Sequence, residues 1–108
     1  MYARMATFTV NDSSTAEEIG PKIREVAVPI VRSMAGWQGG IQMLDRESGK
    51  LAVIHYFDTK ESMDAAESTF ESMPQQFPEA LRNQMQQAMG GRQSVERFEV
   101  LSEMSASG

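Results

Sequence analysis

Apolar and polar residues alternate along this chain with two periods, and the change from one to the other predicts the secondary structure. A period of two is typical of strands, and a spacing of three and four residues is typical of a helix with one buried face. These two periods predict the order strand, helix, strand, strand, helix, strand. Strands are expected at 2–10, 37–46, 51–57 and 93–101, and helical segments at 14–34, 58–73 and 78–89.

The third strand organises this interpretation because both of its faces are apolar. A strand in a sheet with one wet face alternates apolar with polar residues. In residues 51–57, LAVIHYF, the odd and the even positions are both apolar, with His55 as the exception. Such a strand needs two covers, and the chain is too short to place helices on both faces of a sheet.

The order of elements predicts an α+β domain of ferredoxin-like fold, β-α-β-β-α-β, in residues 1–101. Its four-stranded antiparallel sheet would carry the helices on one face and leave the other face bare. Because residues 51–57 are apolar on both faces, we expect a second copy of the chain to cover the bare face. The prediction is a homodimer, a dimeric α+β barrel, with a flexible C-terminal tail at 102–108.

Proline and glycine set the expected limits of the helices. Gly20-Pro21 and Pro29 interrupt the first apolar stripe, so we expect a kink near Pro29 or an effective start at the first proline. Gly90-Gly91 is expected to end the last helical segment. In the final strand, Phe98 is expected to point inward and Arg97 the opposite way.

Charge and composition exclude several classes of function. The formal net charge of −5 argues against nucleic-acid binding, because contacts to phosphate need clustered Lys and Arg. With no Cys in the chain, disulfides and thiolate metal sites are excluded. No spacing of His and carboxylates predicts a metal site. No stretch predicts a signal segment or a membrane span, so a cytoplasmic protein is expected.

Five short stretches within residues 1–101 form a series in a fixed order. They are Tyr2-Ala3-Arg4, Gly36-Trp37-Gln38-Gly39-Gly40, Asp45-Arg46-Glu47-Ser48-Gly49-Lys50, Phe57-Asp58-Thr59-Lys60-Glu61-Ser62 and Val95-Glu96-Arg97-Phe98-Glu99-Val100. In this order they resemble the dimeric α+β barrel superfamily, and within it uncharacterised bacterial members of the antibiotic biosynthesis monooxygenase-like group. The resemblance implies the same fold, a dimer, and a ligand cleft between the sheet and the helices.

The resemblance also bears on cofactors. Heme-degrading members of the superfamily carry an Asn on the first strand, a Trp at the end of the third strand and a His in the second helical region. In this chain Phe57 stands at the position of that Trp, the strand before Asn11 has no Asn, and His55 is the only histidine. Heme degradation and a cofactor are therefore not expected. Cofactor-free oxygenases of the group bind an electron-rich aromatic molecule, help to remove its proton, and let it reduce oxygen.

His55 is the candidate catalytic residue, because imidazole titrates near neutrality and can act as a general base. It shares a face with Val53 that is expected to look toward the helices. A structural histidine held by a neighbouring hydrogen bond is the alternative. The expected ligand-binding residues are Arg4, Trp37, Phe57, Met63 and Phe70.

The ligand-binding candidates also have structural explanations. A Trp at a helix-to-strand junction, such as Trp37, is often a core residue. Arg4 could instead form an ion pair with Glu96 or Glu99 on a neighbouring strand. An apolar stripe on a helix, such as the one that includes Phe70, is more often core than binding site.

The resemblance and these residues together imply two possible functions. The first is a dimeric protein that binds a small apolar or aromatic molecule, with cofactor-independent oxidation as its reaction. The second is a non-catalytic dimer, a stress-linked or ligand-sensing module, whose cleft is filled by Trp37, Phe57, Phe70 and Met residues. An open cavity reached by His55 and Arg4 would favour the first function.

Overall fold

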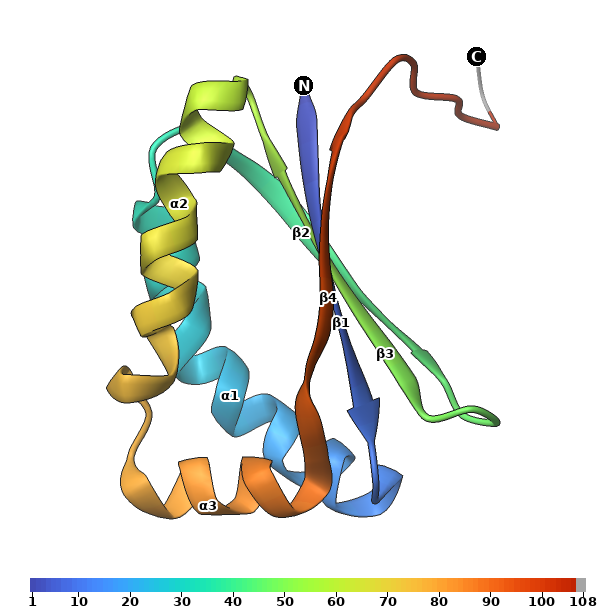
Figure 1. Ribbon diagram of the computed structural model, residues 1–108, viewed down its shortest axis with the longest axis vertical. Helices are drawn as coiled ribbons and strands as arrows, with labels where there is room; N and C mark the ends of the chain where they lie inside the picture. The colour runs from blue at the N-terminus through green and yellow to red at the C-terminus, as the bar shows by residue number, and fades with distance from the viewer. Residues whose placement is uncertain (107–108) are drawn as a thin grey trace.

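Four antiparallel strands form one sheet in the order β2-β3-β1-β4, with three helices beside it (Figure 1). The computed structural model describes residues 1–106. The elements are β1 (Tyr2–Val10), α1 (Ser13–Ser33), β2 (Trp37–Asp45), β3 (Lys50–Phe57), α2 (Lys60–Ser72), the short 3-10 helix η1 (Met73–Gln76), α3 (Glu79–Ala88) and β4 (Met89–Glu99).

The helices cover one face of the sheet and leave the other face bare. Figure 1 shows the sheet nearly edge-on, with α1, α2 and α3 all on one side of it. The predicted α+β, ferredoxin-like arrangement with a four-stranded antiparallel sheet is thereby confirmed. None of the helices among residues 1–106 is apolar and long enough to cross a membrane.

The pairing register decides which side chains share a face. Arg4 on β1 lies opposite His55 on β3 and opposite Arg97 on β4. All three face the helices, because each contacts Phe70 or Glu67 of α2. Ala3, the next position, lies opposite Phe98 and faces the bare side. The prediction that the face of the third strand with Val53 and His55 looks toward the helices is therefore correct.

The predicted orientation of the last strand is wrong. Arg97 faces the helices, where its Nη2 lies 2.8 Å from a carboxylate oxygen of Glu67 on α2. Phe98 lies on the bare face and is 49% exposed. The pattern suggested the opposite because an apolar residue was expected on the helix side, whereas Glu67, a half-buried acid on α2, pairs with the arginine there.

Strand β4 also begins earlier than expected. Gly90-Gly91 lies inside β4, which starts at Met89, directly after α3. Helix α3 ends before this pair, because Met89 is already extended at φ −131° and ψ 140°, so the glycines are not needed to end the helix. At the other end no helix or strand follows Glu99 up to residue 106. The last two residues of the predicted tail, 107–108, lie outside the described residues.

Helix α1 starts well before its first proline, contrary to one expected boundary. The carboxylate of Asp12 caps the helix, accepting hydrogen bonds from the backbone N–H groups of Ser14 and Thr15 at 3.1 and 3.2 Å. The helix then continues through both prolines to Ser33. Burial of Ile19 near one end and Val31 near the other holds it in place.

Two separate apolar clusters connect the helices to the rest of the fold. The first lies mainly between α1 and α3 and is built on Ile19, Phe77, Leu81 and Ala88. The second, named the sealed cluster, consists of Phe57, Met63 and Ala66 and lies between α2 and the end of β3. A large part of the helix side of the sheet belongs to neither cluster.

Candidate functional site

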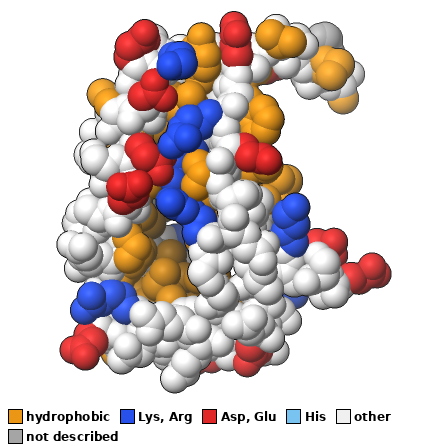
Figure 2. All heavy atoms as spheres, in the orientation of Figure 1, with side chains coloured by type: hydrophobic (Ala, Val, Ile, Leu, Met, Phe, Trp, Pro, Cys, Tyr) orange, Lys and Arg blue, Asp and Glu red, His pale blue; other side chains and the backbone are white. Residues whose placement is uncertain are grey.

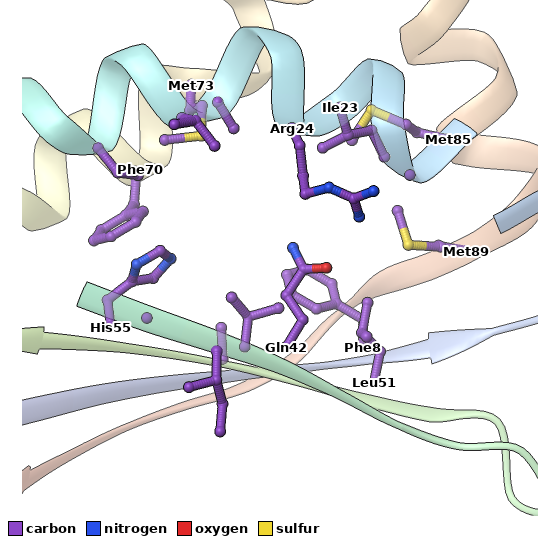
Figure 3. A pocket seen from close by; sticks show the side chains of 18 of the residues that line it. Phe8, Ile23, Arg24, Gln42, Leu51, His55, Phe70, Met73, Met85 and Met89 are labelled. Atoms are coloured by element: carbon purple, nitrogen blue, oxygen red, sulfur yellow. The ribbon is translucent and has the colours of Figure 1, made fainter. Parts of the chain in front are cut away.

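A cavity of about 930 Å³ lies between the sheet and the helices. Its floor comes from β1, β2 and β3, and its walls come from α1, α2, η1 and α3 (Figure 3). Most of the lining is apolar, including Phe8, Ile23, Leu51, Met85 and Met89. A space of this size is typical of small-molecule sites in proteins.

At one end of the cavity, three side chains from three elements lie against one another. Arg4 and His55 are neighbours across β1 and β3, and Phe70 of α2 covers both. The guanidinium carbon of Arg4 lies 4.0 Å from the centre of the Phe70 ring, a cation-π geometry. The His55 and Phe70 ring centres are 4.9 Å apart. This end therefore offers a positive charge, an imidazole and an aromatic face together.

A hydrogen bond from Trp37 fixes the protonation of His55. The indole Nε1–H of Trp37 donates to Nδ1 of His55 over 3.0 Å. Because Nδ1 accepts, the proton of the neutral imidazole is assigned to Nε2. Gly40 on β2 makes room for the ring, since a Cβ at that position would lie 2.9 Å from Nδ1 of His55.

The surroundings of His55 keep its imidazole neutral. Burial, which disfavours the charged form, and then the nearby charge of Arg4 lower the pKa of His55 from 6.5 to about 4. At neutral pH the side chain is therefore a hydrogen-bond donor through Nε2–H. To act as a general base, His55 would need the lone pair of Nδ1, which already accepts the hydrogen bond from Trp37.

Arg4 is held by a carboxylate that sequence reasoning did not connect to it. Its Nε and Nη2 donate to the two carboxylate oxygens of Glu67 over 2.7 and 3.1 Å, and Arg4 is only 3% exposed. The alternative expectation, an ion pair of Arg4 with Glu96 or Glu99, is therefore wrong. This bidentate ion pair links β1 to α2.

Glu67 is shared by three arginines. Besides Arg4, it contacts Arg97 at 2.8 Å and Arg92 at 3.7 Å. Hydrogen bonds from Arg4, and then its charge and that of Arg97, lower the pKa of Glu67, so the carboxylate is ionised at neutral pH. Figure 2 shows Lys and Arg side chains gathered between α2 and β4, beside a hollow floored by hydrophobic side chains. One carboxylate with three guanidinium groups leaves an excess of positive charge at this edge.

Two donors at the aromatic end remain free for a ligand. Nη1 of Arg4 and Nε2 of His55 have no hydrogen-bond partner within residues 1–106. In the same residues every fully buried side-chain nitrogen or oxygen has a hydrogen-bond partner. Because these two atoms have none, they are not fully buried. Because both side chains line the cavity, the two donors can meet a ligand oxygen there.

The structure brings together four of the predicted site residues and separates the other two. Arg4, Trp37, His55 and Phe70 line the cavity. Phe57 and Met63 are 0% and 2% exposed in the sealed cluster, and they do not line the cavity. They support Phe70 from behind, since the Phe57 and Phe70 rings meet edge to face at 6.5 Å.

Three polar residues of the site were not predicted. Glu67 could have been found, because it lies on the same helical face as Met63 and Phe70, four and three residues away, so it interrupts an apolar stripe. Arg24 on α1 and Gln42 on β2 have no such signal, and only the tertiary structure turns both into the cavity (Figure 3). Within residues 1–106 no group of His, Asp and Glu could hold a metal ion.

No protein-family model matches the chain, and no curated protein matches it. Similarity is found among solved structures. A candidate antibiotic biosynthesis monooxygenase from Nitrosomonas europaea has a TM-score of 0.62 at 14% identity, covering 94% of this chain and 100% of that chain. A dimeric ferredoxin-like protein from an uncultured marine organism has a TM-score of 0.67 at 14% identity, covering 96% and 90%.

A third neighbour is the heme-degrader MhuD from Mycobacterium tuberculosis, with a TM-score of 0.69 at 13% identity, covering 97% of this chain and 100% of that chain. The structural neighbours are thus antibiotic biosynthesis monooxygenase-like proteins of ferredoxin-like fold. This agrees with the resemblance noted in the sequence. At such low identities the likeness establishes the fold alone.

Proposed function

We propose that this protein binds a small aromatic or apolar molecule in the cavity of each protomer of a homodimer. The observation that supports the proposal is an open cavity of about 930 Å³ onto which Arg4 and His55 face. The competing idea, a cleft filled by the chain's own side chains, would need Trp37 and Phe70 to close this space. Both residues lie at its wall instead.

The geometry suggests how such a molecule would be oriented. Phe70 offers a ring for stacking, already placed 4.9 Å from the imidazole of His55. A ligand oxygen beside this ring would accept hydrogen bonds from Nε2 of His55 and Nη1 of Arg4. Phenols, quinones and aromatic carbonyl compounds combine a flat ring with such an oxygen.

We further propose that the bound molecule is oxidised without a cofactor. Two neighbours from Nitrosomonas europaea and Chloroflexus aurantiacus are described as candidate antibiotic biosynthesis monooxygenases. An electron-rich phenol or quinol that has given its proton to water can itself pass electrons to oxygen, so that the ring is oxidised and O2 is reduced. Donors such as Arg4 and neutral His55 would favour that deprotonated form by stabilising the negative oxygen.

Heme does not fit this site as a resident cofactor. MhuD is described with heme bound in its active site, which makes heme a candidate ligand for the cavity of this chain as well. The only histidine, His55, receives a hydrogen bond at Nδ1, which leaves the proton on Nε2 and no lone pair for iron. We therefore base no step of the proposed function on heme.

The bare face of the sheet supports the homodimer. Three large apolar side chains on it, Ile41, Met43 and Phe98, are 44 to 49% exposed in a single protomer. Packing of two such sheets face to face would cover them. Size-exclusion chromatography with light scattering is expected to give twice the mass of one chain, and Ile41→Lys with Phe98→Lys is expected to give monomers.

Trp37 provides a direct test of binding, because it is the only tryptophan and it lines the cavity. Small phenols, naphthols and quinones are expected to change its fluorescence in a saturable way. Ala27 of α1 lines the cavity, so Ala27→Phe should weaken binding by filling the space. Ala65→Phe, on the exposed side of α2, is the matched control and should bind normally. Equal binding by both variants would refute the proposed site.

Catalysis is tested separately by oxygen uptake with a panel of quinols and polyphenols that bind in the first assay. We expect uptake above the rate of the free compounds, and loss of that uptake in Ala27→Phe. Binding without any uptake would leave a ligand-sensing protein and remove oxidation from the proposal.

A further inference from the structure

We infer that the natural ligand of this cavity is an amphipathic anion, whose charged group is bound between Arg24 of α1 and Gln42 of β2. The inference rests on the proposed function and adds the chemical class of the ligand. Its carboxylate, sulfate or similar group would lie at the polar pair, and its flat apolar body would extend toward Phe70.

The lining of the cavity is basic although the chain as a whole is acidic. The chain has a formal net charge of −5. The charged lining residues are Arg4, Glu17, Arg24, Arg32 and Arg92. Glu17 forms its ion pair with Arg46, which lies outside the lining. A basic lining in an acidic protein raises the local concentration of anions.

Arg24 is the lining arginine whose charge is least compensated. Arg4 and Arg92 share the carboxylate of Glu67. Arg32 lies in the last turn of α1, where a cation interacts with the partly negative carbonyl end of the helix. Arg24 forms no ion pair with any residue in the described part of the chain. Its guanidinium group is therefore free to meet a ligand.

The side chain of Arg24 points into the cavity. Figure 3 shows its guanidinium group extending from α1 into the space, with the Gln42 amide reaching up from β2 toward it. The side chain lies along the cavity face of α1, because its Nη1 is 3.5 Å from the Cβ position of Gly20, another lining residue. A guanidinium and an amide N–H₂ converging from opposite walls form a pair of donors suited to a carboxylate or sulfonate.

The surroundings of this pair determine the rest of the ligand. Figure 3 places His55 and Phe70 at one end, and Phe8, Leu51, Met85 and Met89 on the other side of the polar pair. A ligand with charge at every position would be excluded by these apolar walls. One anionic group on an otherwise apolar, ring-containing body matches both parts of the lining.

Two fluorescent probes with the same skeleton test the inference. Anilinonaphthalene sulfonate carries one negative charge, and N-phenyl-1-naphthylamine is its neutral counterpart. We expect the anionic probe to bind the wild-type protein at least about five times more tightly, and added KCl to weaken only that probe. Arg24→Gln should weaken the anionic probe by about tenfold, the effect of one charge-assisted hydrogen bond at a partly exposed site. The neutral probe should change by less than about twofold.

Controls separate the failure of this inference from the failure of the proposed function. Arg82→Gln, the same substitution on the exposed surface of α3, should leave both affinities unchanged. If Ala27→Phe abolishes binding of the neutral probe while Arg24→Gln leaves the anionic probe unaffected, the anion inference is refuted and the cavity is retained. If Ala27→Phe alters neither probe, the cavity is not the binding site and both proposals fail.

Discussion

The helix layer meets the sheet in two different ways at its two ends. At the α2 end, Phe57, Met63 and Ala66 form the sealed cluster, in which Phe57 is 0% exposed. At the α1 end, the helix packs chiefly against α3, and a cavity of about 930 Å³ separates it from the sheet. The cavity therefore arises because helix α1 is held away from the sheet.

This difference in packing explains why the α1 end is suited to a ligand. Ile23, Ala27 and Val28 of α1 line the cavity and are only half-buried, so part of their apolar surface lacks a covering partner. A ligand that filled the space would bury this surface and stabilise the fold. The polar residues of the lining then limit the kind of ligand that fits. His55 and Arg4 offer donors at one end of the cavity, and Arg24 offers a positive charge nearer its middle.

The largest expected difference between the two ends is in stability, and matched truncations measure it. Phe57→Ala removes a ring from the sealed cluster and should lower the free energy of unfolding by about 3 to 4 kcal/mol. Phe8→Ala removes the same ring from the cavity floor, where it is half-buried, and should cost about 1 kcal/mol. Urea denaturation measures both. Equal losses would show that the two ends are packed alike.

The next largest effect concerns the carboxylate at the border of the two regions. Glu67→Gln leaves Arg4, only 3% exposed, without its counter-charge, and should cost about 2 kcal/mol at pH 7, less than for a fully buried pair because Glu67 keeps some contact with water. Glu71→Gln, one turn further along α2 and exposed, is the control and should be nearly neutral.

The dependence of that loss on pH sharpens the test. The pKa of Glu67 is lowered from 4.5 in the folded protein, so its stabilising contribution is present above about pH 4.5 and is lost as the pH falls through the lower folded value. The difference between wild type and Glu67→Gln should therefore shrink in acid. A constant difference from pH 7 to pH 3 would mean that packing, and not charge, causes the loss.

The two ends differ in how far the sequence could predict them. The succession of helices and strands along the chain and the apolar stripe through Met63 follow from local periodicity, and the helix-facing position of His55 follows from the fold expected from that succession. The cavity does not, because it depends on where α1 comes to rest, and that is decided by contacts of Ile19 with the distant α3. Residue patterns report that a face is apolar, without reporting whether another element reaches it.

The last strand illustrates the same limit on a smaller scale. Alternation placed Arg97 and Phe98 on opposite faces correctly, yet the assignment of faces was reversed. The missing information was the position of Glu67, a single acid in an apolar helical stripe that binds Arg97 at 2.8 Å. Sequence spacing gives the relative orientation of neighbours in a strand, and a partner on another element gives the absolute one.

The cavity histidine should affect stability only below about pH 6.5. Because the folded pKa of His55 is about 4 and its ordinary value is 6.5, the unfolded chain binds a proton in this range that the folded protein does not. The free energy of unfolding should therefore fall as the pH is lowered from about 6.5 to about 4, by at most about 1.4 kcal/mol per pH unit. His55→Gln should remove this slope. NMR titration of the imidazole should show no change between pH 7 and pH 5.5.

The smallest predicted effect tests Trp37, the residue that connects the two regions. Its ring packs against the sealed cluster, and its Nε1–H holds His55 at the cavity. Trp37→Phe keeps an aromatic ring and removes the donor, so we expect a loss of about 1 kcal/mol. The imidazole proton should then be distributed over both ring nitrogens, whereas ¹⁵N chemical shifts should place it on Nε2 in the wild type. An unchanged Nε2–H tautomer in the variant would mean that Trp37 does not set it. In that case the sealed cluster would support the cavity only by packing.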